Sequence, residues 1–314
     1  MRPRVAITPG DPRGIGPEIV EEVMRNPPGG AEYVLIGERG AGSGSLPGQV
    51  AEDVTRPVSG GTAPRSPLPA REAGLAVKSQ IEHAVALALA GKVDAIVTGP
   101  AEKHALHLAG VPYPGHTEWL AALAGGAPVA MMLTDERLRV VLVTTHLPLR
   151  EVAAAVTRER VEVVGAVTRA ALRDRWGMPN PRLAVCALNP HAGEQGLFGR
   201  EDDEVLAPAA RALGAAGPLP ADTVFVRALR GEFDAVLAPY HDVGMTAIKV
   251  AAFGRAVNVT LGLPFVRTAP DHGTALDIAG KGIADPSSFR AAVELAVKLG
   301  ERGAGSGTLP KRGR

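Results

Sequence analysis

The stretch VVLVTTHLP at residues 140–148 is an apolar, β-branched run that ends at a polar residue, His146. The same arrangement recurs twice, in LAVCALNPHAGE at residues 183–194 and in DAVLAPYHDVG at residues 234–244. Each run is typical of a strand, and each contains a histidine where the strand gives way to a loop. Because open α/β sheets bind ligands at the carboxyl ends of their strands, the three histidines are expected at a ligand-binding edge.

These histidines, His146, His191 and His241, predict a site for a divalent metal ion. Neutral imidazoles that converge from separate loops are suitable ligands for such an ion. One histidine in this setting would more often be a hydrogen-bonding loop residue, but three in matching positions favour ligands. His104 and His107 lie three residues apart on a predicted helix and could form another metal pair, although a solvated helix face is the simpler interpretation.

The composition excludes several classes of protein. The 314 residues are 46% hydrophobic and 21% charged, which is enough apolar sequence for a large core and two lobes. The net charge of +1 leaves no basic footprint for nucleic acid, and no apolar run is long enough to cross a membrane. The apolar segment at the amino terminus is too short for a signal peptide. We therefore expect a soluble, cytoplasmic protein whose one cysteine, Cys186, is a buried structural thiol.

Strand-like runs alternate with alanine-rich helical patterns along the chain, which indicates βαβ units: an α/β fold with mainly parallel sheets flanked by helices. Strands are expected at residues 5–8, 33–36, 94–98, 130–134, 140–145, 183–188, 234–238 and 256–261. Helices are expected at residues 17–25, 70–90, 117–123, 158–175, 202–213, 223–230, 273–279 and 287–299. The short polar turn DER at 135–137 predicts an antiparallel hairpin. Residues 37–69 and 300–314 lack periodicity and are expected to be a loop and a frayed terminus.

Two glycine-containing segments could bind an anion. TPGDPRGIGPEI at residues 8–19 follows a strand and opens a helix, so it is either an anion-binding helix end or a tight βα turn. In GHTE, His116 is expected in a loop at the amino end of another helix, and Thr117 can cap that helix. A histidine in that place is well positioned to contact a phosphate or a carboxylate.

Three polar residues near the predicted strand at 256–261 suggest where the charge of a substrate is neutralised. Lys249, Asn258 and Arg267 offer two cations and an amide, which suit a phosphate or carboxylate group. Ordinary surface charge is the alternative for the two cations. Arg267 fits that alternative poorly because it lies in the low-charge run GLPFVRTAPDHGT.

Six segments occur together in this chain: ITPGDPRGIGPEI, TGPAEKHALHLAGVPYPGHTEWLA, VVLVTTHLPLREV, LNPHAGEQGLFGRED, DAVLAPYHDVGMTAIK and NVTLGLPFVRTAPDHGTALDIAGKGIADP. In order and spacing they resemble the 4-hydroxythreonine-4-phosphate dehydrogenase family of pyridoxine biosynthesis. The resemblance implies an NAD(P)-dependent oxidoreductase with a two-lobed, isocitrate/isopropylmalate-dehydrogenase-like fold. It assigns residues 1–126 plus 262–314 to the first lobe. It assigns residues 127–261 to the second, with the metal and the dimer interface.

The resemblance also assigns roles by position. It implies a homodimer with its active sites at the subunit interface, and one divalent ion whose ligands are contributed across the dimer by His146, His191 and His241. The substrate-binding residues that it implies are His116, Thr117, Lys249, Asn258 and Arg267. Two aspartates match positions beside this site and are the candidate catalytic residues, Asp222 and Asp242.

The implied reaction is the oxidation of 4-phosphooxy-L-threonine at C3 by NAD or NADP, with decarboxylation to 3-amino-2-oxopropyl phosphate. Three histidines favour Zn²⁺ or Co²⁺, with Mg²⁺ and Mn²⁺ as alternatives. The rival substrates are threonate or erythronate 4-phosphate, or a carboxylated cis-dihydrodiol, for a paralogous dehydrogenase. A metal-dependent binding protein without catalysis is the rival of a different class. The sequence contains no acidic Rossmann residue that would distinguish NAD from NADP.

Overall fold

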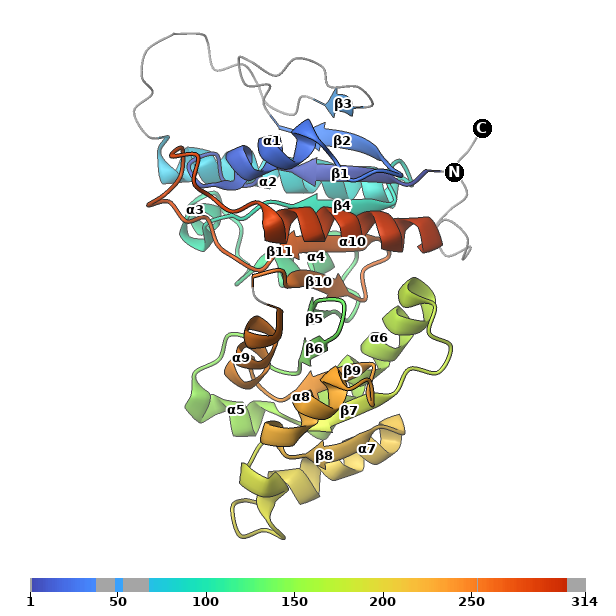
Figure 1. The fold of residues 1–314 in the computed structure, drawn as a ribbon. Helices are drawn as coiled ribbons and strands as arrows, with labels where there is room; N and C mark the ends of the chain where they lie inside the picture. Colours follow the sequence, from blue (N-terminus) through green and yellow to red (C-terminus); the bar gives the residue numbers. More distant parts are fainter. Residues whose placement is uncertain (1, 38–48, 53–67, 253, 304–314) are drawn as a thin grey trace. The chain divides into compact units, whose positions relative to one another are not determined.

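The computed structural model describes residues 2–37, 49–52, 68–252 and 254–303. The chain forms two compact units, Met1–Gly126 with Leu263–Arg314 and Ala127–Gly262. Figure 1 traces the elements of both units along the sequence. Among the described helices, none combines the length and the apolar composition that crossing a membrane requires.

The first unit contains a parallel sheet. Its strands follow the order β3 (Gln49–Glu52), β2 (Glu32–Ile36), β1 (Arg4–Thr8), β4 (Ala95–Thr98) and β11 (Val266–Pro270). Its helices are α1 (Gly16–Arg25), α2 (Ala70–Leu89), α3 (Lys103–Leu108), α4 (His116–Leu123) and α10 (Ser287–Gly303). Helix α10 packs on β11 and β4, and α2 packs on β1 and β4. In Figure 1, α10 covers the near face of this sheet and α2 the far face.

The strand order of the first unit reverses next to β1. β2 and β3 lie on one side of β1, and β4 and β11 on the other. Such a switch point is where open α/β sheets bind ligands, beyond the carboxyl ends of the strands. Here those ends are Thr8 and Thr98, which pair directly.

The second unit contains a mixed sheet. Its strands follow the order β10 (Val257–Leu261), β5 (Ala130–Thr134), β6 (Arg139–Leu142), β9 (Ala235–Ala238), β7 (Leu183–Cys186) and β8 (Ala216–Leu219). β5 runs antiparallel to both of its neighbours, and β6, β9, β7 and β8 are parallel. Its helices are α5 (Leu149–Ala155), α6 (Arg158–Trp176), α7 (Ala207–Leu213), α8 (Ala221–Leu229) and α9 (His241–Ala252), with short turns η1 (Pro190–Gly193) and η2 (Asp202–Leu206).

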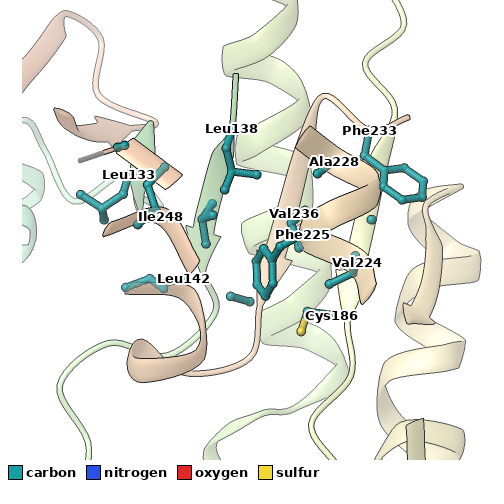
Figure 2. Close-up of a cluster of buried hydrophobic side chains, with 14 of the residues drawn as sticks. Leu133, Leu138, Leu142, Cys186, Val224, Phe225, Ala228, Phe233, Val236 and Ile248 are labelled. Carbon is teal, nitrogen blue, oxygen red and sulfur yellow. The ribbon is translucent and has the colours of Figure 1, made fainter. Parts of the chain in front are cut away.

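One apolar cluster holds α8 and α9 against the second sheet (Figure 2). Val140 and Leu142 of β6 point into it, two residues apart, as the period of a strand requires. Phe225 of α8 and Ile248 of α9 enter from the helices. Helix α9 comes close to the strands at Gly244, where an added Cβ would lie 2.7 Å from a side-chain carbon of Leu142. The absence of a side chain at Gly244 therefore allows this close packing.

The structure confirms the α/β fold with mainly parallel strands flanked by helices, and it confirms the hairpin, in which β5 and β6 pair antiparallel. The side chain of Asp135 builds the turn by accepting hydrogen bonds from the backbone amides of Arg137 and Leu138. Cys186 is buried, as expected. Burial raises the pKa of its thiol to about 12.

Several local expectations were wrong. β3, β8, β11, α5 and α9 were not anticipated, and β3 lies inside the segment expected to be a loop. The helix expected at 273–279 is a series of turns, in which Ala275 has a φ of 43° and interrupts helical geometry. Helix α10 continues to Gly303. The rest of the expected loop at 38–48 and 53–67, and the tail beyond 303, lie outside the described residues.

Candidate active site

Two of the predicted metal ligands lie side by side in the second unit. After β6 and β9 end, Val143 donates a backbone hydrogen bond to Ala238, 2.9 Å from N to O. Thr144 then donates to the carbonyl of Pro239 through its hydroxyl at 2.7 Å. These bonds hold the two strand exits together, and the rings of His146 and His241 follow with their centroids 5.4 Å apart.

This separation suits a shared ion. Two imidazoles that bind one tetrahedral ion through bonds of about 2.0–2.1 Å have ring centroids roughly 5.2–5.4 Å apart. Nδ1 of His241 lies 2.8 Å from Oδ1 of Asp242. A carboxylate in this position fixes the tautomer of a ligating imidazole and leaves the other ring nitrogen, Nε2, for an ion. The His146–His241 pair therefore fits a divalent metal.

His191 does not complete a ligand set within the part of one chain that the structure describes. Across the described residues, no three histidine, cysteine, aspartate or glutamate side chains cluster closely enough to hold an ion. His191 lies in η1, exposed, with its ring 6.2 Å from that of Phe198. Its φ of 53° is in the left-handed region, which is uncommon for a residue with a side chain. One chain thus supplies two of the three predicted ligands as a pair and the third separately.

Three other predicted residues of the second unit occupy different elements. Asp222 is exposed in the first turn of α8, and Lys249 is exposed near the end of α9. Asn258 is in β10, and its Oδ1 is buried without a hydrogen-bond partner. A buried acceptor of this kind is costly unless a ligand supplies the donor.

In the first unit the structure brings together Arg267 and His116. Arg267 lies on β11 with only 3% of its surface exposed, and its Nη2 donates to Oγ1 of Thr98 at 2.7 Å. Burial lowers the pKa of Arg267 to about 10, so the guanidinium remains charged at neutral pH. The alternative of a solvated surface charge does not fit a side chain this buried.

His116 is the first residue of α4, and Thr117 is buried in the same turn. The expectation that Thr117 caps this helix was wrong, because the N-cap is Gly115 and no side chain caps the helix. Nε2 of His116 is buried without a hydrogen-bond partner. Burial lowers the pKa of His116 to about 3, and the charges of Arg267 and Lys103 contribute. His116 is therefore neutral and can act only as a hydrogen-bonding group near the buried cation.

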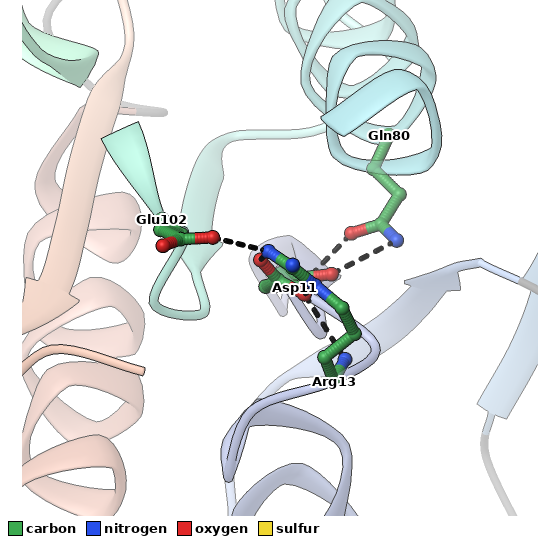
Figure 3. Close-up of polar contacts among 5 residues, drawn as sticks. Asp11, Arg13, Gln80 and Glu102 are labelled. Atoms are coloured by element: carbon green, nitrogen blue, oxygen red, sulfur yellow. Dashed lines mark hydrogen bonds and ion pairs between the residues drawn. The ribbon is translucent and has the colours of Figure 1, made fainter. Parts of the chain in front are cut away.

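The loop at 8–19 is a tight βα turn (Figure 3). Gln80 accepts from the amide of Gly10 and donates to its carbonyl. Arg13 donates to both carboxylate oxygens of Asp11 and to Glu102. These two carboxylates offset the positive charge of the guanidinium. These bonds, and that from the amide of Ile15 to a backbone carbonyl, occupy groups that an anion would need. This ionic network was not anticipated from the sequence.

Comparison with known proteins identifies the family. The sequence model described as "Pyridoxal phosphate biosynthetic protein PdxA" matches residues 53–296. The chain belongs to the PdxA family. A PdxA-family relative named 4-hydroxythreonine-4-phosphate dehydrogenase, from Xanthomonas axonopodis pv. citri (strain 306), is 43% identical over 323 residues, which cover 96% of this chain and 99% of the relative.

Solved structures agree with this assignment to the PdxA family. A crystal structure of 4-hydroxythreonine-4-phosphate dehydrogenase from Klebsiella pneumoniae matches with a TM-score of 0.81 and 40% identity, over 95% of this chain and 99% of that one. A terephthalate 1,2-cis-dihydrodiol dehydrogenase from Burkholderia xenovorans LB400 matches with a TM-score of 0.65 and 29% identity, over 94% and 98%. The resemblance seen in the six sequence segments is confirmed. PdxA membership indicates a dehydrogenase of pyridoxine biosynthesis, which implies a nicotinamide cofactor.

Proposed function

We propose that this protein oxidises 4-phosphooxy-L-threonine at C3 with NAD or NADP and decarboxylates the product to 3-amino-2-oxopropyl phosphate. The observation that carries the proposal is the His146–His241 pair, placed at the carboxyl ends of β6 and β9 in a chain of a dehydrogenase family. The cofactor and the phosphorylated substrate are both metabolites of the cytoplasm, which is where we place the reaction.

His146, His191 and His241 would hold one divalent ion, and neutral imidazoles favour Zn²⁺ or Co²⁺ over Mg²⁺ or Mn²⁺. When bound, the ion would lower the pKa of the substrate hydroxyl and stabilise negative charge on its oxygen, while the nicotinamide accepts the hydride. Asp242 would keep His241 in the tautomer that leaves Nε2 for the ion. Asp222 is proposed as a further catalytic group.

The charged groups of the substrate require cations of the protein. Arg267 can donate two parallel hydrogen bonds to a phosphate or carboxylate, and Lys249 adds a point charge. Asn258 would accept a hydrogen bond through its buried, unpartnered Oδ1, for which an amino or hydroxyl group of the substrate is a suitable donor. His116, which is neutral, and Thr117 would complete the set as hydrogen-bonding groups.

We also propose that the active protein is a homodimer in which His191 reaches the ion of the partner subunit. Within the described residues of one chain, two of the proposed ligands cluster and the third does not, so a second copy would complete the set. Large apolar side chains are exposed close in sequence to the ligands: Leu149, three residues after His146, is 71% exposed, and Leu197, six residues after His191, is 73% exposed. An exposed apolar patch is typical of a surface that another chain covers.

A rival substrate has specific support. The structural relative from Burkholderia xenovorans LB400 acts, by its name, on a carboxylated cis-dihydrodiol. A pocket that binds a carboxylate through Arg267 would suit that substrate, as it would suit threonate or erythronate 4-phosphate.

Reduction of NAD and NADP by the purified protein tests these alternatives. We expect turnover with 4-phosphooxy-L-threonine, release of carbon dioxide in equal amount, and loss of activity after treatment with a chelator. Erythronate 4-phosphate and terephthalate cis-dihydrodiol serve as matched substrates. Faster turnover of either one would transfer the assignment to it, and activity unaffected by complete metal removal would contradict the metal site.

A further inference from the structure

The segment that carries His191 begins where β7 loses its neighbours. The amide of Ala187 still donates to the carbonyl of Leu219, at 2.8 Å. The next two amides have no strand to pair with. Both donate instead to one carboxylate: Leu188 N lies 2.8 Å from Oδ1 of Asp202, and Asn189 N lies 3.0 Å from Oδ2. The carboxylate of Asp202 therefore replaces the missing strand partner immediately before His191.

Asp202 is built into the protein interior. It has no exposed surface, although it is an acidic residue. It stands at the start of η2, a single π-helical turn, and such turns are often found at functional sites. A buried carboxylate needs hydrogen bonds to offset its lost hydration, and these two amides supply them.

The backbone that follows is held in an unfavourable conformation. His191, Ala192, Glu194 and Gln195 all have φ between 43° and 55°, in the left-handed region that residues with a Cβ avoid. Runs of this kind persist only where the surrounding structure enforces them, and they gather at functional sites. The two hydrogen bonds of Asp202, to the amides of Leu188 and Asn189, fix the backbone just before this run begins at His191.

We propose that Asp202 is a positioning residue, which holds the His191 loop in its left-handed conformation and so presents the imidazole for metal binding. This inference rests on the proposed function, in which His191 is a ligand. Glu201, the preceding residue, accepts a hydrogen bond from the side chain of Asn189, and its backbone donors are its own amide and that of Arg200. It provides a matched control, because it has the same charge and is adjacent in sequence but does not hold the backbone amides that precede His191.

The test is Co²⁺ binding by the purified full-length protein, measured by equilibrium dialysis and by the visible absorption of the bound ion. Asp202→Asn keeps the shape of the side chain but replaces one acceptor oxygen with a donor. We expect it to weaken Co²⁺ binding about 10- to 100-fold, as loss of a residue that orients a ligand does. Glu201→Gln should change it less than threefold. In a His191→Ala background, Asp202→Asn should cause no additional loss.

Three results decide the fate of this inference and of the proposed function. If His191→Ala weakens Co²⁺ binding and Asp202→Asn does not, the inference is overturned and the metal site stands. If His191→Ala leaves Co²⁺ binding unchanged, the metal assignment fails and the inference fails with it. An additional loss from Asp202→Asn in the His191→Ala background would mean that Asp202 acts on the whole fold, which also overturns the inference.

A second variant covers the case in which Asp202→Asn does not fold. Ala192→Gly removes the penalty of one left-handed residue, because glycine adopts this conformation freely. Combined with Asp202→Asn, it should restore a folded protein and recover part of the Co²⁺ affinity. A folded double variant that binds Co²⁺ as tightly as the wild type would show that Asp202 is not needed to present His191.

Discussion

Replacing the buried Arg267 with methionine is expected to stabilise the protein while impairing it as an enzyme. The side chain is 3% exposed, and burial lowers its pKa from the ordinary 12.5 to about 10. This shift corresponds to roughly 3 kcal/mol by which the charged form destabilises the folded state. Methionine fills a similar volume without the charge, and it forfeits the hydrogen bond to Thr98, worth about 1 kcal/mol.

The balance predicts that Arg267→Met raises the free energy of unfolding by about 2 kcal/mol, or Tm by about 4–8 °C. Because the pKa of the arginine is lower in the folded state than in the unfolded state, the charged arginine destabilises the folded state fully below pH 10. This destabilisation disappears as the pH rises to the unfolded pKa of 12.5. The stability gained by Arg267→Met should therefore be constant between pH 6 and 9. If Arg267 binds the substrate as proposed, the same variant loses a charge-assisted bond worth roughly 1.5–3 kcal/mol, so kcat/KM should fall about 10- to 150-fold.

Thermal unfolding and steady-state kinetics on the same samples check both halves of this prediction. Arg71→Met is the control, because Arg71 is exposed near the start of α2, in the same unit as Arg267, and its replacement should change neither quantity appreciably. Arg267→Lys should recover only part of kcat/KM, since an ammonium cannot make a bidentate contact. An Arg267→Met protein that is less stable than the wild type, or one with unchanged kcat/KM, would refute the reasoning.

Four further predictions concern the histidines and α9. Alanine at His146, His191 or His241 should weaken metal binding strongly and abolish activity while the far-ultraviolet circular dichroism stays that of the wild type; a variant that binds the metal as tightly as the wild type would remove that residue from the ligand set. Mixing inactive His191→Ala and His241→Ala subunits should restore about one quarter of the wild-type activity after random reassortment, because each heterodimer has one intact site, and no recovery in verified heterodimers would contradict a shared site. The pKa of His116 is lowered from 6.5 to about 3, so its contribution to stability is present above pH 6.5 and lost as the pH falls towards 3; denaturant unfolding of His116→Gln should therefore show a shallower decline over this range, by up to about 1.4 kcal/mol per pH unit, and equal declines would mean that His116 is not desolvated. Gly244→Ala should destabilise the protein by about 1–3 kcal/mol, because the new methyl group overlaps a side chain of β6, and an unchanged urea midpoint would show that α9 can move away from the sheet.

The sequence was sufficient for the fold where apolar periodicity is strong. The runs at β5 and β6 and the polar turn between them predicted the hairpin, because alternating burial and a turn sequence act locally. Helix α9 was not anticipated, since its first turn contains Gly244, which is unfavourable in a helix and is explained only by its close approach to β6. β11 was not anticipated because Arg267 interrupts its apolar character, and the hydroxyl that receives this arginine belongs to a strand 169 residues away in sequence.

In the candidate site, too, local sequence patterns predicted some features, while features that depend on loop path and distant contacts were not predicted. Matching strand ends predicted that His146 and His241 would stand at one edge of a sheet, and they lie side by side. The sequence could not reveal that His191 would remain apart from them, because this depends on the path of a loop with left-handed residues. Nor could it reveal Asp202, whose two hydrogen bonds to the backbone reach across 13 and 14 residues.

Only two of the three proposed ligands pair within the described part of one chain, which has a thermodynamic consequence if a second copy completes the site. The ion and the partner subunit would then each increase the affinity for the other, by the same factor. Dilution would release the ion, and chelation would favour dissociation into monomers. Metal content would thus depend on protein concentration, which makes the amount of enzyme in the cell a determinant of the fraction that is active.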